Sequence, residues 1–317
     1  MLNRHFIRAK VLQSLYSFHF NDFNGVNEHT KKLIDSFYSL LDLHTYFFSS
    51  IIYIHTLAQE RIEDNRIKLL PTPEDLNPNT KFVDNEFINI LLNDQTLRAK
   101  MDKMKINWNE SKDLFMGIFK KFSNSNSYKN YMKAPKGDIE SEKNIVVQLF
   151  KNYIISNELY FDNVCEMKIE WESDYDTIAL WSLWKLKEYR GDVSQFSEGF
   201  IDENYISKIF KHTIENNDEF MELINSKIHN WDIDRVALMD ILIIKMGLSE
   251  LIYCPEIPIN VTLNEYVELS KEFSTPKSKL FVNGILDKLM VELRAKGRIK
   301  KLKDENEEVD ENEDTQL

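Results

Sequence analysis

Glycine, proline and cysteine are scarce in this chain of 317 residues, which contains 8 Gly, 7 Pro and 2 Cys. The shortage of glycine almost excludes Gly-rich phosphate loops, and no GxxxxGK[ST], GxGxxG or GxSxG pattern occurs. Cys165 and Cys254 form no CxxC pair and cannot build a disulfide framework, which is typical of a reducing cytosol. The seven histidines lack HxxxH and HExxH spacings, so we expect no metal and no cofactor.

Long apolar runs are also missing. Residues 1–10 carry charges where a signal peptide would need its apolar stretch. The aromatic-rich run Tyr46–Ala58 is interrupted by His55 and is too short to cross a bilayer. We therefore expect a soluble, cytoplasmic protein that makes no membrane contact.

The negative charge of the chain is concentrated at one end. The net charge is −12, but residues 304–317 hold eight acids and no base, and the rest of the chain carries only −4. Residues 294–303, just before this tail, hold six bases and no acid, and residues 1–20 also contain bases without acids. The total charge therefore hides two basic chain ends, which are compatible with nucleic-acid binding. We expect the acidic tail itself to be disordered.

The hydrophobic spacing predicts an all-α protein, and no alternating strand pattern or internal repeat stands out. A T-x-x-E capping box at Thr262–Glu265 predicts a helix start. Residues 71–80 and 123–138 read as loops, and Trp171, Trp181 and Trp184 are expected in the core. The helical segments are predicted over residues 3–20, 28–70 (as one or two helices), 84–122, 141–189, 203–229, 232–252, 262–273 and 278–295.

Three segments resemble the NusB family. Residues 4–16 (RHFIRAKVLQSLY) are similar to its Arg-rich opening helix, which ends in A-L-Q-x-L-Y. Residues 240–251 (DILIIKMGLSEL) are similar to its D-R-x-x-L-R-L-x-x-x-E-L helix. Residues 257–273 (IPINVTLNEYVELSKEF), followed by residues 278–288 (SKLFVNGILDK), resemble I-P-x-x-V-x-I-N-E-A-V-E-L-A-K-x-F and S-x-K-F-V-N-G-V-L-D-K. Two specific motifs in the family's order and spacing make chance an unsatisfactory explanation.

The resemblance implies a helical bundle in two packed halves, with extra helices between the first helix and the C-terminal half. Residues 1–202 would form the N-terminal half, with a large insertion at about 25–200. Residues 203–303 would form the C-terminal domain, and residues 304–317 the tail. It also implies a non-enzymatic transcription antitermination factor. Such a factor binds boxA-like single-stranded RNA from rRNA operons with its partner NusE, and joins the RNA polymerase antitermination complex.

The resemblance places the RNA surface on the opening helix and the F-V-N-G segment, and the protein partner surface at Glu250. Cations would hold phosphates, while Tyr16 and Phe281 would stack on unpaired bases. Core packing remains an equal alternative for both rings, and a solvated helix end an equal alternative for residues 294–303. The RNA-binding residues predicted in this way are Arg4, His5, Arg8, Lys10, Tyr16, Lys279, Phe281 and Asn283.

The chain departs from the family pattern at several basic positions. The opening arginine run is thinned to Arg4 and Arg8, Ile241 replaces an arginine, and Leu280 replaces a lysine. Fewer phosphate contacts predict weaker RNA binding at a given salt concentration. Two alternatives therefore stay open: a helical protein–protein scaffold with little or no RNA binding, and an RNA-targeting module related to rRNA methyltransferases. The second would need a Gly-rich methyl-donor domain, which the composition does not favour.

Overall fold

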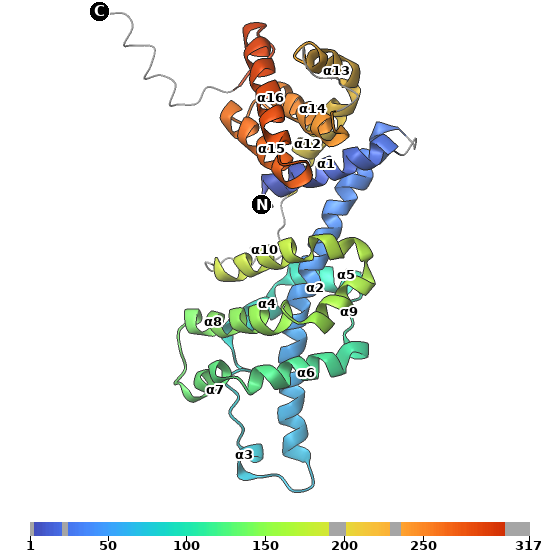
Figure 1. Ribbon diagram of the computed structural model, residues 1–317. Helices are drawn as coiled ribbons and strands as arrows, with labels where there is room; N and C mark the ends of the chain where they lie inside the picture. The colour runs from blue at the N-terminus through green and yellow to red at the C-terminus, as the bar shows by residue number, and fades with distance from the viewer. Residues whose placement is uncertain (1–2, 21–24, 190–200, 229–235, 302–317) are drawn as a thin grey trace, which may run out of the picture. The chain divides into compact units, whose positions relative to one another are not determined.

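The computed structural model describes residues 3–20, 25–189, 201–228 and 236–301 (Figure 1). Regular structure in these ranges is helical, with α-helices, short 3₁₀ segments and one π-helix, and no strand. The prediction of an all-α protein is confirmed. The helices form two compact units: Met1–Ser36 together with Phe200–Leu317 (unit 1), and Phe37–Gly199 (unit 2). Helix α2 begins in unit 1 and continues in unit 2.

Unit 1 is built around α14, Leu238–Tyr253, which is buried without interruption from Asp240 to Leu251. A helix that is apolar on all sides needs neighbours on all sides, and α12, α15, α16 and α1 supply them. Gly247 allows a close approach, since a Cβ there would lie 2.9 Å from Leu286 Cδ2 of α16. The other helices of unit 1 are α1 Arg4–Phe20, the start of α2, α12 Glu203–Glu215, α13 Asn217–Asn225, α15 Ile259–Phe273 and α16 Ser278–Ala295.

Unit 2 contains most of α2, Val26–Ile67, and an aromatic core around it. Phe47 of α2 packs its ring against Phe150, Tyr160 and Tyr175, with centroids 5.2–6.3 Å apart. Two of these contacts, with Phe150 and Tyr175, are edge-on, a geometry that stabilises a core beyond the area that it buries. In the described part of unit 2, the remaining elements are α3 Pro73–Leu76, α4 Glu86–Asn93, α5 Gln95–Met104, η1 Asn109–Ser111, α6 Lys112–Ser123, α7 Asn126–Lys133, α8 Ile139–Leu149, η2 Phe150–Ile154, α9 Glu158–Met167, η3 Ile169–Asp174 and α10 Tyr175–Lys187.

Several predicted boundaries are wrong for local reasons. The polar segment 123–138 contains α7, which begins where the Ser125 side chain accepts a hydrogen bond from Tyr128 N. The Pro-rich segment 71–80 contains the short helix α3, with a reciprocal capping box between Thr72 and Asp75. The segment 203–229 is two helices, α12 and α13, which break at Asn216.

The predicted capping box at Thr262 is not a helix start. Helix α15 begins at Ile259 with Pro258 as its N-cap, and Thr262 lies inside its first turn. The end at Phe273 and the whole of α16 match the prediction. The tryptophans also differ, because Trp171 is buried whereas Trp184 is 51% exposed.

The two units group the chain differently from the predicted division at residue 202. Helix α1 lies in unit 1 because its apolar side chains are buried against α12, α14 and α15, far along the sequence. The predicted acidic tail, residues 304–317, lies outside the described residues. Within the described ranges, no helix combines the length and the apolar character that a membrane crossing requires.

Candidate nucleic-acid interface

Helix α1 joins the C-terminal helices through one buried arginine. Arg8 is 1% exposed and donates from Nε and Nη2 to the two carboxylate oxygens of Glu250, both at 2.8 Å. Its Nη1 donates to Glu265 Oε2 of α15 at 3.0 Å. This two-pronged geometry is specific to arginine, because a lysine cannot make two parallel bonds to one carboxylate.

Glu250 is fully buried, and its two oxygens accept five hydrogen bonds. Besides the two from Arg8, Tyr205 OH donates at 2.6 Å, Thr262 Oγ1 at 2.9 Å and Tyr266 OH at 3.0 Å. A buried charge is tolerated when it is paired and its lone pairs are filled. The carboxylate therefore ties α1, α12 and α15 to α14.

The network keeps Glu250 ionised. Burial alone would raise the pKa of this carboxyl, but the hydrogen bonds and positive charge of Arg8, with the hydroxyl donors, lower the pKa below its usual 4.5. Burial and the nearby Glu250 charge raise the pKa of the Tyr205 and Tyr266 hydroxyls, so both remain donors.

Arg8 and Glu250 therefore have internal roles in place of the surface roles predicted for them. The Arg8 guanidinium is engaged by two carboxylates and is closed off from solvent. Glu250 is 0% exposed, so it can reach a partner protein only through the helices it holds. The two family motifs that contain these residues meet in the core of unit 1.

The other predicted residues of α1 lie nearer the surface. Arg4 lies over the Tyr205 ring, with its Cζ 5.3 Å from the ring centroid, and Lys10 lies 6.0 Å from the centroid of Phe6. His5 is half-buried, and its two ring nitrogens lie 3.1 Å from carboxylate oxygens of Glu265 and Glu272. Tyr16 is 41% exposed near the end of the helix, and its ring lies against Phe20 with the centroids 4.9 Å apart.

The predicted residues of α16 lie beside its buried face. Lys279 and Asn283 are exposed, and Phe281 is half-buried. Asn283 Nδ2 donates to Asp287 Oδ2 at 2.8 Å, which leaves its carbonyl oxygen for another donor. Leu280, where the family has a lysine, is 74% exposed, so a cation in this position would face solvent.

The structure gives one link between the two predicted groups of residues. His5 contacts Glu272 in the last turn of α15, and α15 leads through residues 274–277 directly into α16. The first turn of α1 therefore lies at the end of α15 from which the chain enters α16.

The basic tract 294–303 is partly used inside unit 1. Lys301 Nζ donates to the backbone oxygens of Glu250 and Cys254 at 3.0 and 2.8 Å, so it caps the last turn of α14. Arg298 pairs with Glu219 of α13, and Lys296 with Glu292. Among the described residues of the tract, two cations are thus paired with acids and a third is bound to backbone oxygens of α14.

Other motif residues also turn out to be internal connectors. Ser278 Oγ donates to Asp240 Oδ2 at 2.8 Å, which joins the start of α16 to the start of α14. Both side chains are buried. The sequence analysis missed this pair and the hydroxyls around Glu250; an acid inside the apolar run 240–251 was the signal that could have revealed them.

Comparison with known proteins agrees with this architecture. The NusB family model matches residues 185–291, which begin at the end of α10 and reach into α16. This region of the chain is therefore similar to the NusB family. The chain as a whole is longer than a typical member of the family. No solved structure matches the chain.

Three relatives are named transcription antitermination protein NusB. The protein from Salinibacter ruber is 34% identical over 31% of this chain and 61% of its own length. The protein from Chloroherpeton thalassium is 30% identical over 39% of this chain and 63% of its own length. The protein from Myxococcus xanthus is 45% identical over 24% of this chain and 54% of its own length. The chain thus spans a little over half the length of the curated relatives that it matches.

Proposed function

We propose that this chain is a non-enzymatic, cytoplasmic antitermination factor that binds boxA-like nascent rRNA-operon RNA together with NusE. In this role it joins the RNA polymerase antitermination complex. The observation that carries the proposal is the NusB-family domain, whose relatives are named for transcription antitermination. Helix α1 supports it, because the basic N-terminal segment packs onto that domain despite its distance in sequence.

The surface groups of unit 1 fit single-stranded RNA. Lys279 supplies an exposed cation, Asn283 an exposed amide and Tyr16 an exposed ring. Lysines bind phosphates, and aromatic rings stack on unpaired bases. With Arg8 engaged internally, fewer cations remain for phosphates, so the proposed affinity depends on a small number of contacts.

The test is fluorescence anisotropy of the full chain with a labelled boxA-type RNA at low salt, with and without NusE. We expect binding that strengthens when NusE is added. The variant Lys279→Ala with Asn283→Ala should weaken it and reduce the slope of log affinity against log salt by about 0.7, one phosphate contact. Lys31→Ala, an exposed lysine elsewhere in unit 1, is the matched control.

No binding with or without NusE at low salt would refute the proposal. It would favour the second candidate, a helical protein–protein scaffold. One observation supports that candidate. In the helix that resembles the family's RNA-binding helix, the arginine Arg8 is hydrogen-bonded to Glu250 inside the unit. A scaffold of this kind would still bind NusE in a pull-down with purified proteins.

A further inference from the structure

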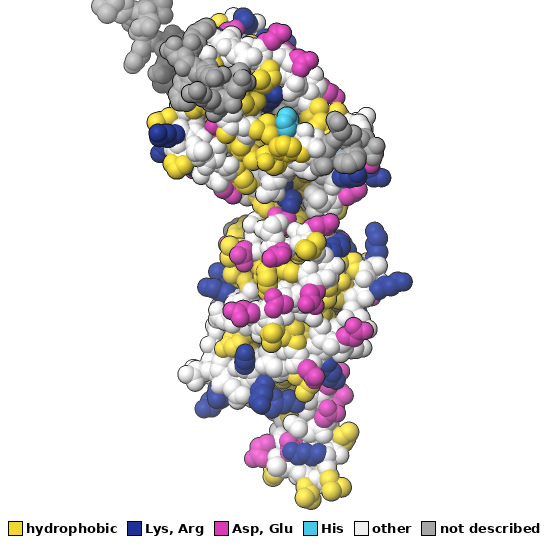
Figure 2. Space-filling model, turned by 45° about the vertical axis from the view of Figure 1, so that its right-hand side comes forward, with side chains coloured by type: hydrophobic (Ala, Val, Ile, Leu, Met, Phe, Trp, Pro, Cys, Tyr) yellow, Lys and Arg dark blue, Asp and Glu magenta, His cyan; other side chains and the backbone are white. Residues whose placement is uncertain are grey.

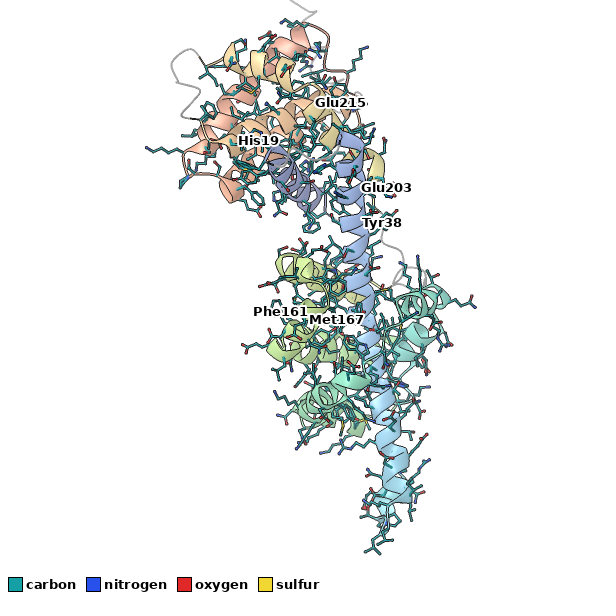
Figure 3. All side chains as sticks on the ribbon, turned by 90° about the vertical axis from the view of Figure 1, so that its right-hand side faces the viewer. His19, Tyr38, Phe161, Met167, Glu203 and Glu215 are labelled. Carbon is teal, nitrogen blue, oxygen red and sulfur yellow. The ribbon has the colours of Figure 1, made fainter. Side chains whose placement is uncertain are left out.

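Unit 2 separates its charges along the chain. Residues 95–137, which include α5, α6 and α7, hold ten Lys or Arg and three Asp or Glu. Residues 158–176, which include α9 and η3, hold seven Asp or Glu and one Lys. Figure 2 shows clusters of Lys and Arg and rows of Asp and Glu on different parts of unit 2. A polyanion would be attracted to the first region and repelled by the second.

The basic helices carry cations that are free to bind. Lys120 and Lys121 of α6 and Lys129 of α7 are exposed, and none has an acidic partner among the described residues. By contrast, Lys112 is paired with Glu60 and Lys136 with Glu86. Unpaired lysines thus lie at the end of α6 and on α7.

An open pocket of ≈490 Å³ lies directly beside Lys121. Its wall includes Tyr153, the amide side chain of Asn152, and Ser156 and Asn157 at the start of α9. Pockets of this volume hold small organic groups, and a nucleobase with its sugar is in that range. Tyr153 is half-buried, so part of its ring is open to solvent.

The backbone at the pocket is unusual. Residues Phe150–Ile154 form a π-helical segment at the end of α8, and π-helical turns are frequent at functional sites. This segment places Tyr153 against Phe122 of α6, with ring centroids 5.4 Å apart, and Phe122 in turn contacts Tyr128 of α7 at 5.0 Å. The ring of Phe122 therefore contacts both the pocket residue Tyr153 and Tyr128 of the basic helix α7.

The polar groups of the pocket can serve base edges. Asn152 is exposed with both halves of its amide open, and Asn157 uses its Oδ1 to cap Tyr160 N, which leaves Nδ2 as a donor. Glu158 also lines the pocket. A carboxylate there can accept a hydrogen bond from the N3–H of a uracil or from the amino group of another base, and the nearby Lys121 reduces its repulsion of phosphate.

From these contacts we propose a second site for single-stranded RNA on unit 2. A base stacks on Tyr153 in the pocket, and the flanking phosphates bind Lys121 and Lys129. This inference rests on the proposed function for its choice of ligand, and it assigns a role to the part of the chain outside the NusB-family match. A paired duplex does not fit, because its bases cannot reach an aromatic ring.

The test uses the full chain and a labelled oligouridine of ~15 nucleotides, a length that covers one such site. We expect Lys121→Ala with Lys129→Ala to lower the salt slope by about 1.4, or two phosphate contacts. Tyr153→Leu should weaken binding about five- to a hundredfold with the slope unchanged, whereas Tyr153→Phe should bind as the unaltered chain does. Lys187→Ala, an exposed lysine on α10, is the control and should have no effect.

Binding with unchanged affinity and slope in the lysine variant would overturn the inference. The inference would also be overturned if unlabelled poly-glutamate displaced the labelled RNA as effectively as unlabelled oligouridine does. The surface would then fit an acidic protein. The boxA-type RNA separates this failure from that of the proposed function. If boxA binding weakens in the Lys279 and Asn283 variant while oligouridine binding is unchanged in the Lys121 and Lys129 variant, the unit 2 site is refuted and the proposed function stands. If oligouridine binding weakens in the Lys121 and Lys129 variant while boxA RNA does not bind the unaltered chain, the proposed function fails and the unit 2 site stands.

Discussion

The substitution Glu250→Gln tests whether the buried carboxylate holds unit 1 together. Glutamine preserves the shape but replaces one acceptor oxygen with an NH₂ group, which faces donors on either side of the carboxylate. It also leaves the Arg8 guanidinium buried with only Glu265 opposite it. Breaking a buried ion pair from one side typically costs about 3–5 kcal/mol. Since Glu265 remains, we expect about 3 kcal/mol.

Hydrogen exchange measured by mass spectrometry is the appropriate assay, because bulk unfolding of a chain with two compact units is not a two-state process. Amides of α14 and α15 should exchange about a hundredfold faster in the variant, as about 3 kcal/mol requires. Amides of α8 in unit 2 should keep their rates, which makes them an internal reference.

A second variant separates loss of the pair from loss of shape. Arg8→Met combined with Glu250→Gln removes both charges, and it should recover most of the protection, because a neutral buried pair needs no counter-charge. If Glu250→Gln alone leaves the α14 amides within about threefold of their original rates, the carboxylate is not the anchor that its hydrogen bonds indicate.

Three further predictions follow from unit 1 and its neighbours. The lowered pKa of Glu250 stabilises the fold at pH values above its unfolded value of 4.5, so the free energy of unfolding should decrease as pH falls through the folded pKa. Circular dichroism should show loss of helix over this pH range in the unaltered chain, and this loss should be absent in the Arg8→Met, Glu250→Gln variant. Lys301→Ala removes the cap on two carbonyls of α14 and should destabilise its last turn by about 1 kcal/mol, read as faster exchange there, with Lys300→Ala as the control. Burial raises the pKa of the Cys254 thiol to about 12. At pH 8 a thiol reagent should therefore label the half-exposed Cys165 and leave Cys254 unreacted until the chain unfolds. Equal labelling of the two thiols would contradict the burial of Cys254.

The positions of helices and their buried faces were predicted best where apolar residues recur at helical spacing without interruption. The stripe of α16, from Val282 to Leu293, is buried as predicted, and the helix has the expected ends. Helix α1 was also placed correctly, with Ile7, Val11 and Leu15 buried. In these helices the hydrophobic pattern alone decides both the element and its inward face.

The burial of Arg8 could not be read from its own residue type. A cation at the start of an amphipathic helix is ordinarily solvated, and only the position of its partner 242 residues away reverses that expectation. Two signals were nevertheless present. Arg8 is spaced at helical intervals from the buried Leu12 and Leu15, and Glu250 lies within an apolar run. An acid and a base that both lie on apolar helix faces are expected to pair with each other in the core. Where several such residues occur, the sequence does not show which of them form the pair.

Short helices in polar segments were missed because their stability comes from packing. Helix α7 has a polar sequence, but Tyr131 and Tyr128 anchor it, and Lys81 Nζ donates to the Tyr131 carbonyl at 2.7 Å. Tertiary contacts of this kind override composition. The same applies to the pocket beside Tyr153, since its walls come from α6, the π-helical segment and α9.

The buried pair also explains how unit 1 tolerates the long insertion within it. Closing a loop costs about (3/2)RT ln n, so the roughly fourfold lengthening of the chain between α1 and α14 by unit 2 adds only about 1 kcal/mol. An inserted segment that folds as its own compact unit fixes its two ends and lowers this cost further. The buried contacts of Arg8 with Glu250 and Glu265 join α1 to α14 and α15 across this length of chain. Because this penalty is small and unit 2 is compact by itself, a surface such as the Tyr153 pocket can be built from unit 2 alone.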